Sequence, residues 1–167
     1  MAQTPPPAGA PGPSFSMSNL STADKIIIGS AGLYIIWAFF PVWYKFSVSA
    51  GIPGIPGFSA SINGFRGVTL IAWLLALAAV VWALLPAFGV RMQVSFKPAM
   101  VDLGLAGLAT LLTLLGLVVK PTGFGISFGI FVAVILALAW LYGAYMKFQQ
   151  APATTMPPFA PPPPPPA

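Results

Sequence analysis

The stretch FGISFGIFVAVILALAWLYGAYM, residues 124–146, is uncharged and carries small residues at regular intervals. These are Gly125, Gly129, Ala133 and Ala137, one at every fourth position. On an α-helix this spacing drifts by only about 40° per step, so the small residues form one shallow groove on a single face. Such a groove allows the backbone of another helix to approach closely within a membrane. The stretch therefore predicts a membrane-spanning helix that packs against neighbours.

Three further apolar runs supply those neighbours. Hydrophobic residues make up 57% of the 167 residues and charged residues only 5%, a balance that ordinary soluble domains do not have. Each run approaches the length of about 20 residues that crosses a bilayer. The sequence predicts an all-α membrane protein, a four-transmembrane-helix antiparallel bundle. Its expected spans are residues 22–40, 67–89, 99–119 and 124–146.

Local signals mark where these spans begin and how they connect. Ser21 followed by Asp24 predicts a helix start with a hydroxyl cap. Pro98 suits the first turn of the third span, where its missing N–H has no helical partner. The short turn at residues 120–123 makes the third and fourth spans an antiparallel pair.

The second and third spans also carry small residues at helical spacing. Alanines of the second span follow a 4-3-4 spacing, at Ala72, Ala76, Ala79 and Ala83. We expect this row, and Ala76 and Ala83 in particular, to pack against other helices. In the third span Gly104 and Gly107 begin a three-residue repeat that continues through Thr110, Thr113 and Gly116. That step drifts by about 60°, so we expect these residues to face two neighbours.

The first connection, residues 44–66, has the periodicity of strands. Apolar and polar residues alternate over 44–50 and again over 58–63. Between them Ile-Pro-Gly occurs twice, over residues 52–57, and this segment must turn. We predict a small β-hairpin in the first external loop, lying on the membrane surface, with an irregular interfacial loop as the alternative. The expected contact points for a partner are Phe46, Val48, Phe58 and Ile62.

Aromatic residues gather where the first span meets this loop. Trp37, Trp43 and Tyr44 lie within a few residues of one another. Amphipathic rings favour the boundary between hydrocarbon and water. We expect these three side chains to form an interfacial belt and not a cage around a ligand.

Proline-rich segments flank the predicted transmembrane domain, residues 21–147. Residues 1–20 and 148–167 hold most of the 20 prolines and too few apolar side chains to form a core. We predict disordered tails with polyproline character. Two roles are open for these tails, keeping the chain ends soluble or binding a proline-recognising protein through an aromatic groove.

Most residue types that perform chemistry are absent. The chain has no histidine and no cysteine, and its only acids are Asp24 and Asp102. Without them there is no Cys/His zinc site, no imidazole base and no catalytic triad. The seven basic residues are scattered singly, which is typical of headgroup anchors and not of a nucleic-acid surface. We expect a protein without enzymatic activity, cofactor, metal or nucleic-acid partner.

Asp102 is the only acid inside an apolar run. A carboxylate in hydrocarbon indicates function by default. However, Asp102 lies only about 6 Å beyond Pro98 along a helix, near the membrane boundary. We expect it to act as an anchor, stabilised by the helix dipole and by Arg91 or Lys97. Proton or ion coupling through Asp102 is the alternative.

The basic residues give a weak indication of orientation. Four spans would place Lys25, Arg91, Lys97 and Lys147 on one side of the membrane and Lys45, Arg66 and Lys120 on the other. Arg91 and Lys97 lie in a short loop, where the positive-inside rule is most effective. We expect a multi-pass protein of the plasma membrane, a bacterial inner membrane, with cytoplasmic termini and an external hairpin.

The first loop resembles that of uncharacterised small four-span membrane proteins common in actinobacteria, through the segments PVW (41–43), FSVS (46–49) and SINGFRG (61–67). The order of four spans with a β-rich first loop is also similar to that of claudins, whose paired loop cysteines are absent here. The resemblance implies the topology and no activity.

These observations favour a protein that works by contact. Our hypothesis is a non-enzymatic accessory or scaffold subunit of a larger plasma-membrane or cell-envelope assembly, bound to another membrane protein or to a second copy. The lipid bilayer is its solvent. The alternative function is that of a minor transporter or channel component that uses Asp102.

Overall fold

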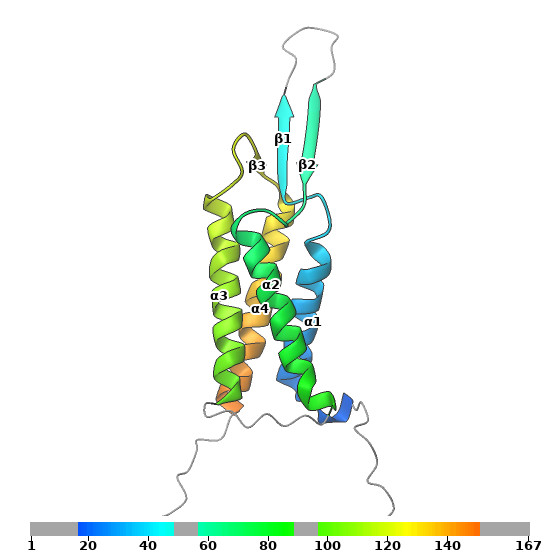
Figure 1. The fold of residues 1–167 in the computed structure, drawn as a ribbon, viewed down its shortest axis with the longest axis vertical. Coiled ribbons are helices and arrows are strands. Elements are labelled where there is room, and N and C mark those ends of the chain that lie inside the picture. Colours follow the sequence, from blue (N-terminus) through cyan, green and yellow to red (C-terminus); the bar gives the residue numbers. More distant parts are fainter. Residues whose placement is uncertain (1–16, 49–56, 89–96, 151–167) are drawn as a thin grey trace, which may run out of the picture.

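The computed structural model describes residues 17–48, 57–88 and 97–150. Four long helices lie side by side, and a small sheet stands at one end of them (Figure 1). They are α1 (Thr22–Trp37), α2 (Val68–Leu84), α3 (Pro98–Val118) and α4 (Phe128–Gln150). The short 3-10 helix η1 (Met17–Asn19) precedes α1, and a second one, η2 (Leu85–Phe88), extends α2.

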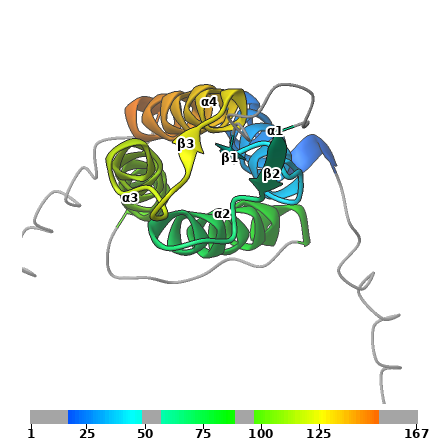
Figure 2. The same ribbon diagram turned by 90° about the horizontal axis from the view of Figure 1, so that it is seen from above.

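The helices form a closed ring in chain order, seen from above in Figure 2. Helix α1 contacts α2 and α4, and α3 contacts the same two helices. Successive helices run in opposite directions, so the prediction of an antiparallel four-helix bundle is confirmed. Three helical segments, Val68–Phe88, α3 and α4, are long and apolar enough to cross a membrane. Helix α1, at 16 residues, is shorter.

Helix α1 begins as predicted and ends early. The Asp24 N–H donates to Ser21 Oγ at 3.1 Å, and the Ser21 N–H donates back to Asp24 Oδ2 at 3.1 Å, so the predicted cap is present. The helix stops at Trp37 and not at residue 40. After Trp37 the chain tightens into 3-10-type turns, in which Phe39 N–H donates to the Ile36 carbonyl and Phe40 N–H to the Trp37 carbonyl. Pro41 then prevents the helix from continuing, because a proline disfavours the helical conformation of the residue before it. Contrary to the predicted disordered tail, residues 17–19 form η1 and Leu20 is buried.

Helix α4 begins four residues later than predicted. Gly123 has a φ of 83°, which turns the chain, and Gly125–Ile126 then forms the strand β3. Glycine is a poor helix former, and the backbone of this segment is satisfied by pairing with β1 instead. The prediction that Gly125 begins the groove is therefore wrong. The helix extends to Gln150, so the predicted tail at 148–150 is also wrong, while the predictions for residues 1–16 and 151–167 lie outside the described chain.

The interior of the bundle is rich in small side chains, beside a few large ones such as Tyr34, Ile130 and Trp140, while many large apolar side chains are exposed. The alanines predicted to pack in α2 are all fully buried, together with alanines of the other helices: Ala31, Ala106, Ala109, Ala133, Ala137 and Ala144. Large side chains such as Val81, Leu111, Phe131 and Ile135 are exposed. A bundle dissolved in water would be expected to bury its large apolar side chains, because their burial is the main driving force for folding in water. The distribution matches a bundle solvated by lipid, where close backbone packing drives helix association.

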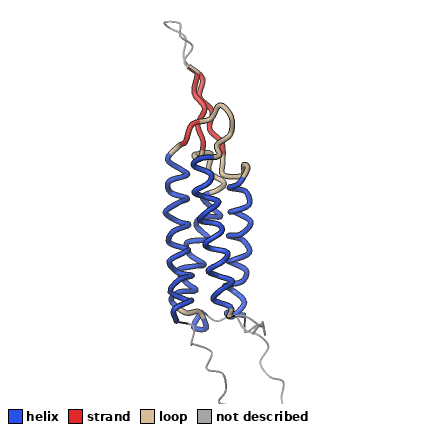
Figure 3. The backbone as a smooth tube through the Cα atoms, turned by 90° about the vertical axis from the view of Figure 1, so that its left-hand side faces the viewer, coloured by secondary structure: helices blue, strands red, loops and turns tan. Residues whose placement is uncertain are grey.

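The sheet has three strands in the order β2-β1-β3. Strand β1 (Tyr44–Val48) pairs antiparallel with β2 (Phe58–Ile62), from Tyr44 opposite Ile62 to Val48 opposite Phe58. The predicted hairpin is confirmed and the irregular loop is excluded, although its repeated Ile-Pro-Gly turn lies mostly in residues 49–56, outside the described chain. The hairpin extends along the bundle axis and does not lie flat across the helix ends, as Figure 3 shows.

Candidate functional site

The two acidic residues of the chain meet a single lysine at the end of the bundle opposite the hairpin. Lys147 Nζ lies 2.7 Å from Asp24 Oδ1 and 2.7 Å from Asp102 Oδ2. The side chain of Asp102 is 0% exposed, that of Asp24 is 8% exposed and that of Lys147 is 19% exposed. We call these three residues the charged cluster. It joins α1, α3 and α4.

The cluster carries more negative than positive charge. Two carboxylates and one ammonium leave a formal charge of −1 when all three groups are ionised. The Ser21 hydroxyl donates to Asp24 Oδ2 at 2.7 Å, whereas Asp102 Oδ1 has no hydrogen-bond partner among the described residues.

The partner of Asp102 differs from the one expected. Lys97 does not form the ion pair that we predicted, and Arg91 lies outside the described residues. Lys147 takes this place because it extends from the last turns of α4, which runs antiparallel to α3. Burying charges is tolerated only when they are paired. The cluster therefore ties three helices together at one end of the bundle.

The opposite end of the bundle carries the hairpin base, which comprises residues 42–45, 62–65 and 124–129. Trp43 and Tyr44 both lie opposite Ile62, since the Trp43 N–H donates to the Ile62 carbonyl at 3.2 Å and Tyr44 pairs with Ile62 in the strand register. Two residues opposite one make a β-bulge, which redirects a side chain that strict alternation would point outward. Trp43 and Tyr44 are accordingly both buried.

These two aromatic rings fix the hairpin onto the helices. Trp43 Nε1 donates to the Trp37 carbonyl at 3.1 Å, and its ring covers Gly64 so closely that a Cβ there would lie 2.6 Å from it. The prediction of an interfacial belt is wrong for Trp43 and Tyr44, because both rings fill the space between the sheet and the bundle. Only Trp37 remains half-buried.

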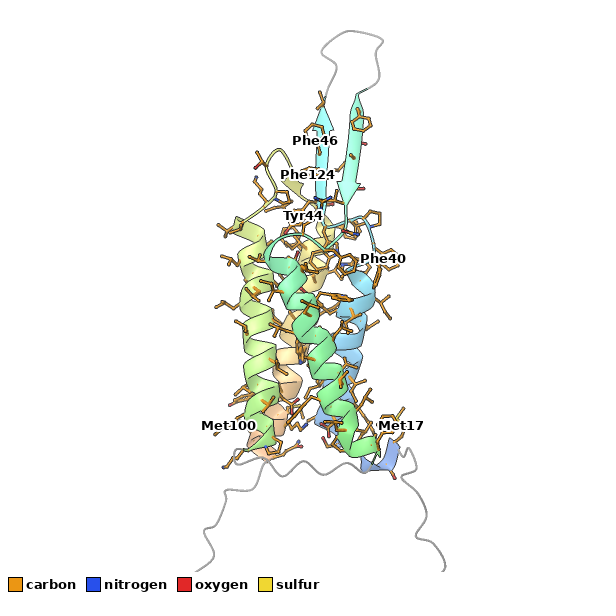
Figure 4. All side chains as sticks on the ribbon, viewed as in Figure 1. Met17, Phe40, Tyr44, Phe46, Met100 and Phe124 are labelled. Atoms are coloured by element: carbon orange, nitrogen blue, oxygen red, sulfur yellow. The ribbon has the colours of Figure 1, made fainter. Side chains whose placement is uncertain are left out.

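Tyr44 links the hairpin to the end of α3. Its hydroxyl donates to the Gly116 carbonyl at 3.1 Å, and Figure 4 shows its side chain beneath those of Phe46 and Phe124. The rings of Phe46 and Phe124 are 5.7 Å apart. Burial raises the pKa of Tyr44 above its ordinary value of 10.0, and the hydroxyl of Thr69 opposes this shift.

We expect Tyr44→Phe to lower the stability of the purified protein by about 1 kcal/mol, the usual net value of a hydrogen bond. Because folding raises the pKa of Tyr44, the stabilising effect of the neutral phenol is complete below pH 10.0 and is lost as the pH rises through the folded-state pKa. Thermal unfolding in detergent at several pH values measures both effects. Tyr142→Phe, at an exposed phenol, is the control. A difference from wild type that is equal at neutral and strongly alkaline pH would contradict this account.

The predicted contact residues share one face of the hairpin. Phe46 stands opposite Ala60, and the outer pair is Val48 with Phe58. Phe58 is 67% exposed and Val48 is 48% exposed, whereas Phe46 and Ile62 are half-buried at the base. The exposed apolar area is thus concentrated on the outer pair.

The predicted helix-packing residues divide into two groups. Ala133, Ala137, Ala76 and Ala83 are buried in the bundle, and Gly129 is buried against Val42 in the segment that follows α1. Gly104 is exposed and Gly107 is half-buried, and no described atom beyond the adjoining backbone of α3 and the flanking residues lies within 4 Å of a Cβ built on either. The packed face of α3 is instead formed by Ala99, Asp102, Ala106, Ala109, Thr110, Thr113 and Gly116.

Two positions that matter in the structure were not predicted from the sequence. A Cβ on Gly143 would lie 2.8 Å from Ile26 Cγ2, so this glycine is also a close-packing site. Its spacing from Gly129 and the alanines of α4 was a signal that could have found it. Lys147 is predicted only as one of the scattered headgroup anchors, and the fact that the chain has only two acids was the available signal for its role.

Comparison with known proteins adds no family to these observations. No model of a known protein family matches the chain. No curated protein is similar enough in sequence to count as a relative.

Proposed function

We propose that this chain is a membrane protein without catalytic activity that acts by contact, as an accessory or scaffold subunit of a larger plasma-membrane or cell-envelope assembly. The observation that carries the proposal is the hairpin. The hairpin extends beyond the helix ends (Figure 1). Trp43 and Tyr44 at its base are buried, while the side chains of its outer pair, Val48 and Phe58, are exposed. An exposed apolar pair on a rigid support is typical of a contact surface.

The proposal includes four membrane spans, with α1 as the fourth. Helix α1 has 16 residues, about 24 Å at 1.5 Å per residue, and the turn after it adds exposed apolar residues, Phe39 and Phe40. It packs against α2 and α4, which both have the length of a span. This shared packing and the likeness of the first loop to four-span proteins support a fourth crossing.

Both termini then lie on one side, which we assign to the cytoplasm, with the hairpin outside. The chain lacks native cysteines, so single cysteines can be introduced without background. A cysteine at Ser47 should react with an impermeant thiol reagent in intact cells, and one at Gln149 should react only after permeabilisation. The reverse pattern would invert the assignment.

The contact function predicts a specific neighbour for the hairpin. A photoreactive amino acid at Phe58 or Val48 should yield one consistent crosslinked product in intact membranes, identified by mass spectrometry. The same group at Ile135, an exposed residue of α4, should give only diffuse products with lipid and random neighbours. Replacement of residues 46–62 by a short polar linker should remove the specific product. If Phe58 and Ile135 give the same distribution of products, the hairpin is not a contact surface.

A transporter or channel component using Asp102 is the alternative function. One observation favours it, the buried Asp102 Oδ1 that lacks a hydrogen-bond partner among the described residues. The ion pair of Asp102 with Lys147 argues against a transport function, because a buried carboxylate paired with a lysine has a structural role without any transport. Loss of proton-linked flux in reconstituted vesicles on Asp102→Asn would favour transport over contact.

A further inference from the structure

One edge of the hairpin is not paired with any other described strand. In the order β2-β1-β3, strand β2 has no described strand on its outer side. Strand β3 covers only Tyr44 and Lys45 of β1 and does not reach β2. A free edge presents a row of backbone N–H and C=O groups that can pair with another strand.

The pairing pattern identifies which residues face this edge. Alternate residues of a central antiparallel strand direct their backbone groups to opposite neighbours. The Ser127 N–H donates to the Trp43 carbonyl on the β3 side, so Lys45, two residues further on, also faces β3. Ser61 lies opposite Lys45 and therefore directs its backbone groups away from β1, and so does Ser59. Neither serine contributes a backbone hydrogen bond to the hairpin itself.

The hairpin end of the bundle also carries an unbalanced positive charge. Lys45, Arg66 and Lys120 are exposed there, in β1, before α2 and after α3. The only acidic side chains of the chain, Asp24 and Asp102, are paired with Lys147 at the other end. The three basic residues at the hairpin end thus have no acidic side chain of this chain to neutralise them.

One face of the hairpin is apolar, and the other is polar and carries a basic residue. Phe58, Ala60 and Ile62 lie on the apolar face of β2, and Ser59 and Ser61 lie on the face that holds Lys45. A strand added beside β2 would continue both faces. Apolar residues at alternate positions would extend the apolar face, and acidic residues between them would point toward the basic side.

We propose that the β2 edge binds an extended acidic segment of a partner protein, in which acidic and apolar residues alternate, as an added strand of the sheet. This rests on the proposed contact function and specifies the chemistry of its partner. Backbone pairing with Ser59 and Ser61 supplies affinity, and the basic side chains together with the apolar face select the sequence.

The test uses the full chain in nanodiscs of zwitterionic lipid and a labelled peptide of alternating glutamate and valine. Binding is measured by fluorescence anisotropy. A peptide of alternating lysine and valine, and one in which all glutamates precede all valines, should bind at least about tenfold more weakly. Ser61→Pro should also weaken binding of the alternating acidic peptide by about tenfold, because it removes an outward N–H without touching the β1–β2 pairing.

The matched control is Ser47→Pro, which removes an outward N–H on the β1 side and should leave binding unchanged. Ser59→Pro is a second variant at the β2 edge, so misfolding of one variant does not decide the outcome. If the alternating acidic peptide binds equally to wild type and to both β2 variants, the proposal of an added strand is wrong. A specific crosslinked product from Phe58 would in that case still support the proposed contact function. Binding that disappears when anionic lipid is included would assign the basic residues to headgroups and also overturn the proposal.

Discussion

Replacing Lys147 by methionine is expected to destabilise the bundle by about 3–5 kcal/mol, the usual loss when one partner of a buried ion pair is removed. The substitution leaves two carboxylates without a counter-charge, and the side chains of Asp24 and Asp102 are 8% and 0% exposed. Unfolding of the purified protein in detergent, followed by the fluorescence of its five tryptophans, measures the change.

The formal charge of the charged cluster also predicts how the variants of its three residues rank in stability. Asp102→Asn should cost clearly less than Lys147→Met, because Asp24 and Lys147 remain as a balanced pair. The double variant should recover part of the stability lost in Lys147→Met, because only one carboxylate then remains unpaired. Lys25→Met removes an exposed lysine at the same end and should change stability by no more than about 0.5 kcal/mol. A loss for Asp102→Asn as large as that for Lys147→Met would refute the charge balance described above.

The second large effect is expected at Gly129, where α4 meets the chain that leaves α1. A Cβ there would overlap the backbone carbonyl of Val42, which cannot move aside as a flexible side chain can. The Gly129 N–H also donates to that carbonyl at 2.9 Å, and Trp37 Nε1 donates to the Gly129 carbonyl at 2.8 Å. Gly129→Ala should therefore destabilise the protein by about 2–4 kcal/mol, through overpacking and one lost hydrogen bond.

Gly107→Ala is the matched control for this substitution. It adds the same methyl group to a helical glycine, and apart from the adjoining backbone of α3 and the two flanking residues no described atom lies within 4 Å of the new position. Alanine is the better helix former, so this variant should be unchanged or more stable by up to about 1 kcal/mol. Unfolding midpoints in the same detergent compare the two variants. If both behave alike, close approach at Gly129 does not hold α4 in place.

Much of the fold could be predicted because its signals are local and periodic. The cap at Ser21, the alanine row of α2, and the alternation in β1 and β2 each depend on residues within a few positions of one another. Periodicity failed in α3, where Gly104 and Gly107 begin the repeat but have no neighbouring element within 4 Å of a Cβ built on them. A three-residue repeat winds around a helix, so only the positions of the neighbouring helices decide which members are buried.

The candidate sites were predictable only in part. The apolar face of the hairpin could be predicted from the sequence, because the alternation of apolar and polar residues within each strand shows which side chains share a face. The pairing of Lys147 with two acids was not visible, because α1, α3 and α4 supply one residue each from distant parts of the chain. No local pattern reports the rotation of one helix relative to another.

The sequence by itself determined that this is an apolar helical bundle with small residues on its packed faces and a hairpin between its first two helices. Tertiary structure alone decided that Trp43 and Tyr44 are buried, that α4 starts after β3, and that one lysine serves both acids. The physical reason is range. Helix and strand periods depend on residues that are close in the sequence. The backbone pairing of residues 124–129 with 42–45, and the ion cluster shared by three helices, join residues that are far apart in the sequence and form only when the helices pack together.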